Sequence, residues 1–441
     1  MVLYFHMVLF FGRIKMADYI KLNIADGVDV LTVPADRFKT NEIAISLTIP
    51  LSEHSASANA LVIMLLSRSN ARFKSLKELN THLASLYGAI LQPSVSKIGE
   101  NQLLKLGITC IDDRFSLDDK KISIECANLL LSLLFEPNFD ENHSFKESNV
   151  ETEKRLLVEK IESEENEKRT YVLRKTEEIM FAGEPYAVNR YGSKESVLAQ
   201  NANSLKAAWQ NLLKSSKVLL TVVGNCAADE IKSLLAEKFA LVERNYKPLS
   251  NAVFKPAVDK VKEVKEEMNV KQGKLVMGFR VNLTPDDKLC SAMRSFADVF
   301  GGGPYSKLFA NVREKMSLCY YCSARYVRQK SYIVVQSGCE EENMDKAVAE
   351  ILNQIEEIKK GNFEYEFASS KIALSDAINS VYDGPDMLES WYISQVADGK
   401  FKSPKVSMAE NEKVTVEEII KCANLIELDT VYKLTTVKEG E

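Results

Sequence analysis

Histidine is scarce in this sequence, and its scarcity restricts the metal chemistry that the chain can perform. The 441 residues contain only four histidines, and no two lie within two helical turns of each other: His6, His54, His82 and His143. A zinc site built on a local pair of histidines is therefore missing. His54 and His82 could meet only through the fold, and two ligands are too few to hold zinc.

Three other features are missing as well. Basic residues are not in surplus, because 57 lysines and arginines stand against 62 aspartates and glutamates, which gives a net charge of −5. We therefore expect no nucleic-acid partner. The phosphate-binding pattern G-x-x-x-x-G-K-[ST] does not occur. No Ser–His or Cys–His arrangement typical of a nucleophilic site is recognisable in the sequence.

Long hydrophobic runs are also missing. The apolar run at residues 2–11 is too short to span a bilayer, and it lacks the positive start and the small-residue cleavage site of a signal peptide. We interpret residues 1–16 as an N-terminal extension from a misassigned start codon, because Met16 begins a more ordinary segment. The predicted location is the cytoplasm, with no membrane partner.

Eight cysteines are scattered through apolar segments, which is typical of reduced, buried thiols in a cytosolic protein. Only Cys319 and Cys322 lie close together in the sequence. A zinc site there would need a second pair or nearby histidines, and neither is present. We interpret these cysteines as structural, and we predict that this chain binds no metal or other cofactor itself.

The order of predicted elements repeats once along the chain. The first set is a strand at 41–52, a helix at 56–69 and a strand at 101–112; the second is a strand at 272–284, a helix at 289–300 and a strand at 331–341. Tyr87 and Tyr320 lie in register at an offset of 233 residues, as do Leu79 and Val312. Further helical stretches are predicted at 145–183 and 203–215 before a strand at 216–225, and at 343–359, 364–379, 385–398 and 415–426.

This repeat predicts an α+β protein of two tandem homologous halves, each a mainly antiparallel sheet with helices packed on one face. We place the halves at 17–245 and 265–441, with a linker at 246–264. The segment 255–274 is dense in lysine and glutamate, which is typical of a solvated linker or of a linker that leads into a strand.

The segment GGGPYSKLFANVREKMSLCYY, residues 301–321, resembles the second-half signature of the pitrilysin/insulinase family of zinc peptidases, the inverzincins. That signature is three glycines, a Ser-(Arg/Lys)-Leu-Phe helix and then Arg-Glu-Lys-x-x-Leu-x-Tyr. The matching residues are Gly301, Gly302, Gly303, Ser306, Lys307, Leu308, Phe309, Arg313, Glu314, Lys315, Leu318 and Tyr320. The resemblance covers nearly the whole chain, and it implies the pitrilysin-like metallohydrolase fold.

The first-half signature of that family, H-x-x-E-H, is missing. In the family, its two histidines ligate zinc and its glutamate takes a proton from the metal-bound water. The corresponding positions here are Asn59, Val62 and Ile63, and the position of a further glutamate ligand is Lys160. Glu159 is adjacent, but a neighbouring helix residue points about 100° away. The resemblance therefore implies a degenerate member with no catalytic residue and no metal of its own.

The resemblance also implies a role for the signature that is kept. In the family, residues at the positions of Arg313 and Tyr320 reach the substrate backbone beside the zinc of a partner half. The guanidinium group of an arginine donates hydrogen bonds to carbonyl oxygens, and a tyrosine hydroxyl can donate a hydrogen bond to a developing oxyanion. The similarity is greatest to a bacterial branch whose chains pair. It implies a substrate-binding subunit in a heterodimer that processes peptides or small unfolded proteins, with the zinc in a homologous H-x-x-E-H partner.

Three alternatives stay open at this point. The chain could form a homodimer when no partner is present. It could be a scaffold or binding protein with no part in an active site, in which case the glycine run is only a turn between helices and Arg313 and Tyr320 are ordinary surface residues. It could also be a self-sufficient peptidase with an unrecognised site, which would cleave peptides alone.

Overall fold

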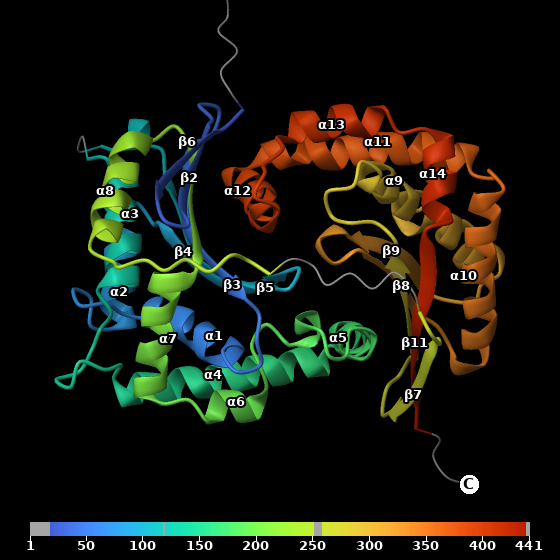
Figure 1. Ribbon diagram of the computed structural model, residues 1–441, viewed down its shortest axis with the longest axis horizontal. Coiled ribbons are helices and arrows are strands. Elements are labelled where there is room, and N and C mark those ends of the chain that lie inside the picture. Colours follow the sequence, from blue (N-terminus) through green and yellow to red (C-terminus); the bar gives the residue numbers. More distant parts are fainter. Residues whose placement is uncertain (1–17, 118–119, 251–257, 438–441) are drawn as a thin grey trace, which may run out of the picture.

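Two β-sheets lie at opposite sides of the molecule, each with its own layer of helices (Figure 1). The computed structural model describes residues 18–117, 120–250 and 258–437. The predicted N-terminal extension, residues 1–16, lies outside these ranges, as does part of the predicted linker.

In the described chain, the first sheet has six strands in the order β1-β2-β6-β3-β5-β4. Neighbouring strands are antiparallel except β2 and β6, which run parallel. The strands predicted at 41–52, 101–112 and 216–225 are confirmed as β3, β5 and β6. The bounds are β1 (Ile20–Ala25), β2 (Val28–Pro34), β3 (Thr40–Pro50), β4 (Ile90–Ile98), β5 (Asn101–Ile111) and β6 (Lys217–Gly224).

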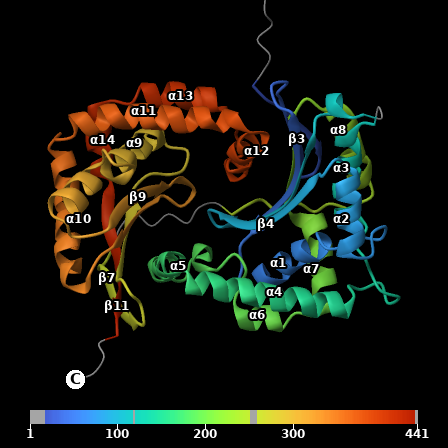
Figure 2. The same ribbon diagram turned by 180° about the vertical axis from the view of Figure 1, so that it is seen from behind.

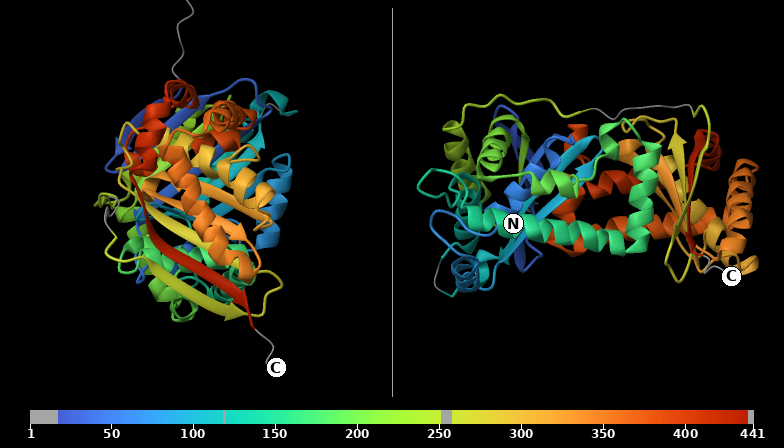
Figure 3. Two further views of the ribbon diagram at one scale, coloured as in Figure 1. Left: turned by 90° about the vertical axis from the view of Figure 1, so that its right-hand side faces the viewer. Right: turned by 90° about the horizontal axis from the view of Figure 1, so that it is seen from below.

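Helices cover the outer face of this sheet and share one apolar core with it. They are α1 (Ala56–Leu66), α2 (Leu76–Ser85), α3 (Ile122–Phe135), α4 (Glu147–Asn166), α6 (Lys194–Leu198), α7 (Ala202–Ser215) and α8 (Ala228–Ala240), with α5 (Lys168–Met180) leading away. The helical stretch predicted at 145–183 is divided at Glu167, whose carboxylate accepts hydrogen bonds from the backbone of Arg169 and Thr170. The view from below shows α5 turning off the end of α4 (Figure 3).

The second sheet has five strands among the described residues, in the order β7-β11-β8-β10-β9, and only β7 and β11 run parallel. Its strands are β7 (Lys262–Met268), β8 (Lys274–Val281), β9 (Tyr321–Val327), β10 (Tyr332–Gly338) and β11 (Ile426–Thr436). The associated helices are α9 (Cys290–Gly301), α10 (Met344–Lys359), α11 (Glu364–Ser380), α12 (Pro385–Ile393), α13 (Pro404–Glu412) and α14 (Val416–Ala423). Among the described helices, none combines the length and the apolar character that crossing a bilayer requires.

The two sheets follow the same plan, which confirms the predicted repeat and the α+β class. Among the described strands, each sheet contains one parallel pair that includes its last strand, β2 with β6 in the first and β7 with β11 in the second, and the remaining pairs are antiparallel. In each half a long helix, α1 or α9, follows the strand next to that last strand. Within both halves the sheet ends in an edge strand, β4 or β9, that hydrogen-bonds to one neighbour.

The inner face of each sheet is covered by a helix from the other half of the chain. On the first sheet, Tyr392 of α12 packs in one cluster with Leu219 of β6. On the second sheet, Val172 of α5 packs in one cluster with Tyr332 of β10. The front and back views show the same two crossings (Figures 1 and 2). The sheets therefore carry the predicted helical layer on one face and, in addition, one crossing helix on the other.

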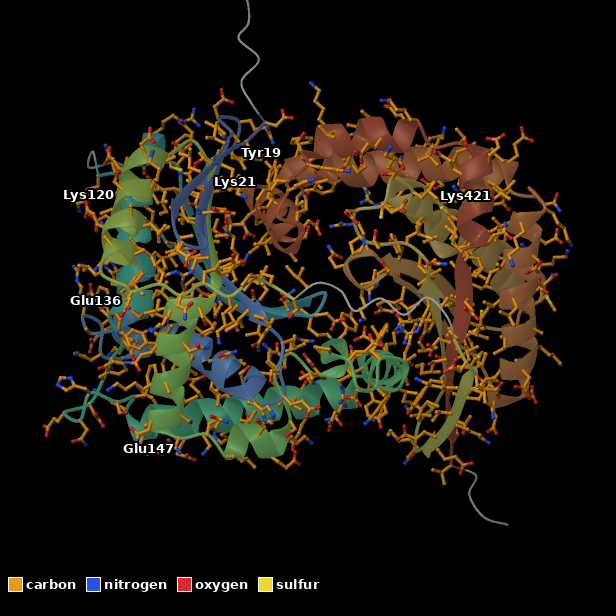
Figure 4. The ribbon with its side chains drawn as sticks, in the orientation of Figure 1. Tyr19, Lys21, Lys120, Glu136, Glu147 and Lys421 are labelled. Carbon is orange, nitrogen blue, oxygen red and sulfur yellow. The ribbon has the colours of Figure 1, made fainter. Side chains whose placement is uncertain are left out.

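Residues at the start of β1 strengthen the contact with the second half. The Tyr19 hydroxyl donates to the carbonyl oxygen of Phe401 at 2.8 Å, and its ring centroid lies 5.3 Å from that of Tyr392. The Lys21 ammonium lies 5.3 Å from the Phe401 ring centroid. Figure 4 labels Tyr19 and Lys21 where β1 approaches the helices of the second half.

A carboxylate is buried beneath α12. Glu42 on β3 has no solvent exposure, and its Oε2 accepts a 2.6 Å hydrogen bond from the Thr109 hydroxyl. Its Oε1 has no hydrogen-bond partner among the described residues. Burial raises the pKa of Glu42 to about 7, although Thr109 and the charge of Lys105 act in the opposite direction. Lys105 pairs at 2.8 Å with Glu389 of α12, which is equally buried.

A buried network of charges also joins the two halves. The Lys330 ammonium contacts the carboxylates of Glu100 and Glu184, and the Lys330 and Glu100 side chains have no exposure. Arg280 on β8 pairs with Asp429 on β11 at 2.6 Å and with Glu184 at 3.4 Å. Glu100 and Glu184 come from the first half, and the three others come from the second. Breaking such a dry network is costly, because each charge that is left unpaired has lost its water.

Candidate functional site

The helix α1 holds Asn59, Val62 and Ile63, the positions predicted to correspond to H-x-x-E-H, and all of them are buried. Asn59, Val62 and Ile63 are each at most 1% exposed. The Asn59 amide donates a 3.0 Å hydrogen bond to Oε1 of Gln102 on β5. Valine and isoleucine offer neither a metal ligand nor a proton acceptor. These positions therefore contribute to the core.

Protein groups satisfy the polar atoms around the start of α1. The Gln102 amide nitrogen donates to the carbonyl oxygen of Ala56 at 2.9 Å and to that of Arg190 at 2.6 Å. The Ser57 hydroxyl donates to the carbonyl oxygen of Tyr191 at 2.9 Å. The segment packs so closely here that a Cβ on Gly192, whose φ is +71°, would lie 1.9 Å from that hydroxyl oxygen. The contacts leave none of these atoms directed at a missing ligand.

Lys160 lies near this region but does not complete a metal site. It is exposed on α4, and its ammonium lies 5.1 Å from the ring centroid of Tyr191. Glu159 pairs instead with Arg155 at 2.7 Å. Across the part of the chain that the structure describes, no three His, Cys, Asp or Glu side chains are placed to hold a metal ion. The residues at these positions do not fit zinc.

The histidines are spread over separate elements. His54 is exposed in the loop before α1, and its backbone nitrogen donates to the Ser52 hydroxyl at 3.3 Å. His82 on α2 stacks on Phe73 with 4.5 Å between ring centroids. Burial and the charge of Arg72 lower the pKa of His82, which favours a neutral ring in an aromatic pair. His6 lies outside the described residues.

The glycine run at 301–303 links α9 to the helix that follows it. A Cβ on Gly301 would lie 2.4 Å from the backbone nitrogen of Ala324 on β9, so only glycine permits this approach of α9 to the edge strand. Gly302 ends α9 by donating its N–H to the carbonyl oxygen of Asp298. The run therefore sets the distance between α9, the next helix and β9.

Arg313 projects from a π-helix, η3 (Leu308–Lys315). The wide turn is closed by a 3.1 Å hydrogen bond from the Met316 nitrogen to the carbonyl oxygen five residues earlier. The guanidinium lies 4.6 Å from the ring centroid of Phe309 and 3.5 Å from the carboxylate of Glu314. The side chain is 41% exposed. Such π-helical turns are rare and are frequent at functional sites.

Tyr320 lies in a bend directly before β9 and is 60% exposed. Its backbone nitrogen donates to the carbonyl oxygen of Gly338 at 2.8 Å, which anchors the bend to β10. Its hydroxyl donates to Oε1 of Glu340 at 3.1 Å. This hydrogen bond, together with the carboxylate charge, raises the pKa of the phenol. The hydroxyl therefore keeps its proton at neutral pH and can act as a donor.

The fold brings Arg313 and Tyr320 to the same end of the edge strand β9. The Leu318 backbone nitrogen donates to the carbonyl oxygen of Val312 at 3.0 Å, which joins the turn that carries Arg313 to the segment just before Tyr320. Along β9, Ser323 and Arg325 are exposed. The two signature residues thus lie beside a strand edge that can accept hydrogen bonds from another chain. Their role in binding substrate stays a prediction.

Sequence spacing did not identify one member of this region, Cys339. The pair Cys319 and Cys322 is visible in the sequence, but Cys339 joins them only because β9 and β10 form a hairpin in which Cys322 is opposite Ser337. The three cysteines belong to one buried apolar cluster, and the Ser337 hydroxyl donates to the carbonyl oxygen of Tyr321 at 2.9 Å. Only the register of the two strands could have predicted this grouping.

Comparison with known proteins gives one family. A family model described as the peptidase M16 inactive domain matches residues 200–374. The chain is 30% identical over 411 residues to a Bacillus subtilis protein named "Probable inactive metalloprotease YmfF", a match that covers 92% of this chain and 96% of that protein. It is 21% identical over 295 residues to an "Uncharacterized zinc protease" of Rickettsia bellii, covering 65% and 69% of the two chains.

Solved structures share the fold. A conserved protein of Enterococcus faecalis superposes with a TM-score of 0.87 at 24% identity, covering 96% of this chain and all of that one. A peptidase M16 inactive domain of Pseudomonas fluorescens gives a TM-score of 0.77 at 15% identity, with coverage of 96% and 100%. At these identities the likeness concerns the fold alone.

Proposed function

The chain belongs to the M16 peptidases, the pitrilysin/insulinase family, and from that membership we propose that it is a non-catalytic, substrate-binding subunit of a heterodimeric zinc peptidase. Its partner is a homologous chain with an intact H-x-x-E-H motif, which supplies the zinc and hydrolyses the peptide bond. The substrate class is a peptide or a small unfolded protein, and the complex acts in the cytoplasm.

The observation that carries this proposal is a contrast between the two halves. The positions of the metal motif are filled by Asn59, Val62 and Ile63, which are buried in the core. Arg313 and Tyr320, in contrast, are exposed, and they lie on the helix η3 and on the bend that precede the edge strand β9. A chain that served only as a scaffold would have no need for an exposed guanidinium group and an exposed phenol in that arrangement.

The edge strand β9 supports a peptide as the ligand. Among the described strands it pairs with β10 alone, so its other edge offers backbone donors and acceptors. An extended peptide can add to such an edge, where backbone hydrogen bonds give affinity with little demand on sequence. Tyr320 would then exchange Glu340 for a substrate carbonyl as the acceptor of its hydroxyl hydrogen bond.

The first experiment measures the native mass of the tagged protein isolated from its own cells, and its zinc content. We expect a complex with one copy of a second, homologous chain and one zinc ion. Peptide cleavage by that complex is then compared with cleavage by the same complex carrying Tyr320→Phe or Arg313→Ala. Loss of an oxyanion donor typically lowers kcat by a hundredfold to a thousandfold, so we expect Tyr320→Phe to lower kcat by about that factor.

Matched controls are available on exposed surfaces elsewhere. Tyr365→Phe removes the hydroxyl of a tyrosine that is 71% exposed on α11, and Arg155→Ala removes a guanidinium that is 64% exposed on α4. Both should leave cleavage unchanged. Equal activity of the complexes carrying Arg313→Ala or Tyr320→Phe would refute the composite site and favour a scaffold. Cleavage by the isolated chain would instead favour a self-sufficient peptidase.

A further inference from the structure

The edge strand β9 carries polar side chains on the inner face of the second sheet, the face that α5 crosses. Residues directly opposite each other in two paired strands place their side chains on the same face. Arg325 is opposite Val334 of β10, and Val334 packs in one cluster with Val172 of α5. Ser323 and Tyr321, two and four residues earlier, therefore lie on the inner face as well. Ser323 and Arg325 are exposed, so α5 leaves this part of β9 uncovered.

The Tyr321 ring holds two cations beside the strand edge. Gly338 of β10 is opposite Tyr321 on one side and opposite Lys274 of β8 on the other. A Cβ on Gly338 would lie 2.4 Å from Cε1 of Tyr321, so the ring occupies the place of a side chain there. The Arg169 guanidinium, at the start of α5, lies over this ring with its Cζ 3.8 Å from the centroid. The Lys274 ammonium lies 5.9 Å from the same centroid.

The cations on this face have no counter-ion of their own. Among the described residues, no carboxylate lies within ion-pairing distance of Arg169, Lys274 or Arg325. The Lys274 ammonium donates instead to the neutral amide oxygen of Gln272 at 2.6 Å. Lys330, in the buried network between the halves, contacts two carboxylates. The charges beside β9 are thus free to meet the charge of a ligand.

Two carboxylates lie close to these cations in the sequence, and both accept hydrogen bonds from other groups. Glu340, two residues after Gly338, accepts from the Tyr320 hydroxyl at 3.1 Å. Glu167, two residues before Arg169, accepts from backbone nitrogens at the start of α5. Neither carboxylate therefore forms an ion pair with a cation of the β9 face.

The equivalent edge strand in the first half, β4, offers a comparison within the chain. Ser96 of β4 is opposite Leu103 of β5, which packs with α12 on the inner face of that sheet. The inner-face positions of β4 that alternate with it carry no charge: Ile90, Gln92, Ser94 and Ser96. Pro93, in the middle of β4, has no backbone N–H to offer a ligand. Unpaired cations along the edge are therefore particular to β9 and not common to both edge strands.

We propose that the β9 edge selects acidic peptides, with Asp or Glu at two positions four residues apart, one facing Arg325 and the other facing Arg169 and Lys274. A strand added to β9 lies about 4.8 Å away, and its side chains alternate between the two faces with the period of β9. The four residues from Tyr321 to Arg325 span about 13–14 Å, which equals the same separation in an extended peptide. The residue midway faces Ser323 and needs no charge. The inference rests on the function proposed above only in placing a peptide at β9.

The test measures binding of labelled peptides of about ten residues to the whole chain by fluorescence anisotropy, at about 50 mM and about 500 mM salt. The peptides share a background of Thr, Val and Ser, and differ only at two positions four residues apart, which hold Glu, Gln or Lys. We expect the Glu peptide to bind about twofold to fivefold more tightly than the Gln peptide for each charged pair, and the Lys peptide to bind most weakly. The differences should shrink at high salt.

Reversing a charge on the protein should reverse the preference at one position. With Arg325→Glu, the Glu peptide should lose its advantage, and one of the two peptides that carry one Lys and one Glu should bind best. Which of the two does so reports the direction in which the peptide runs. Arg155→Glu, a change of the same kind at an exposed position of α4, should leave the order of affinities unchanged.

The other outcomes separate this inference from the proposed function. Equal binding of the Glu, Gln and Lys peptides would refute the acidic preference and leave the proposed function intact, because backbone hydrogen bonds alone bind all three. A preference for Glu that persisted in both Arg325→Glu and Arg169→Ala would refute its placement at β9. If none of the peptides bound, β9 would not be a peptide site. The kinetic test with Tyr320→Phe decides the composite active site independently of these results.

Discussion

The buried carboxylate Glu42 makes the stability of this protein depend on pH in a direction opposite to that of most carboxylates. Burial raises its pKa from 4.5 to about 7, so the folded state holds the proton more tightly than the unfolded chain. As pH rises from 4.5 toward 7, the unfolded chain loses this proton first, and the free energy of unfolding falls. Above pH 7 both states are ionised, and the contribution is constant. Replacement by glutamine, which stays neutral, should remove this dependence.

The size of the effect follows from the width of that interval. Each unit of pKa shift corresponds to about 1.4 kcal/mol, so the interval from 4.5 to about 7 corresponds to about 3 kcal/mol. Asp386 and Glu389 on α12 add repulsion to an ionised Glu42, and Lys105 offsets part of it. In Glu42→Gln, the amide oxygen can still accept from Thr109, whereas the amide nitrogen replaces the unpartnered Oε1. Burying that nitrogen without an acceptor lowers the unfolding free energy of the variant, but by an amount that does not vary with pH.

The assay is urea unfolding of the wild type and of Glu42→Gln between about pH 5 and about pH 8, with the difference in unfolding free energy plotted against pH. We expect the unfolding free energy of the variant to rise relative to that of the wild type as pH rises, by about 3 kcal/mol in total. Above pH 7 the difference between the two should stay constant. The control is Glu53→Gln, an exposed change in the loop before α1. The difference in unfolding free energy between this variant and the wild type should not vary with pH. A flat difference for Glu42→Gln too would refute the argument that a neutral carboxyl is buried beneath α12.

Four further outcomes follow from features already described. Lys330→Met should lower the unfolding free energy by about 3–5 kcal/mol, because two buried carboxylates lose their cation; a change below about 1 kcal/mol in urea titration would contradict the buried network. Gly301→Ala should lower the thermal midpoint, since its Cβ meets the Ala324 nitrogen at 2.4 Å; an unchanged midpoint would show that α9 and β9 can separate freely. Zinc or a chelator should leave the thermal midpoint of the isolated chain unchanged, and a shift would reveal a metal site that no described cluster provides. Alkylation of Cys319 by iodoacetamide should be half-maximal near pH 7, whereas a midpoint near that of an ordinary thiol would contradict the lowering of its pKa.

Local patterns in the sequence predicted the elements that form locally and failed where distant segments meet. The apolar periodicity of α9 and the strand patterns of β3, β5 and β10 were sufficient for their positions. The alternation in β3 places Glu42 on a polar face, but α12 covers that face, and no signal within the strand reveals a helix more than three hundred residues away. For the same reason the inclusion of Cys339 in the apolar cluster of Cys319 and Cys322 depends on the register of the hairpin.

The candidate site also has features that local sequence patterns predicted and features that they did not. Motif spacing located Arg313, Tyr320 and the helix that carries Asn59, because a motif is a local pattern. It did not predict that Gln102 on β5, which lies 43 residues further along the chain, would accept the hydrogen bond of the Asn59 amide. Nor did it predict that Arg313 lies on a π-helix, whose residues Leu308 and Val312 are buried in the core of the second half. The role of Arg313 and Tyr320 toward a substrate awaits the kinetic test.

The crossing of α5 and α12 has a consequence for how such a chain could arise and for what half of it could do. The two helices occupy corresponding places in the repeat, and each completes the other half's sheet. This is the arrangement of a two-fold, domain-swapped dimer, except that both halves belong to one polypeptide chain. A single half, produced alone, would leave the inner face of its sheet uncovered and its crossing helix without a surface to pack on. Such a half should be insoluble as a monomer and should recover solubility by exchanging that helix with a second copy of itself.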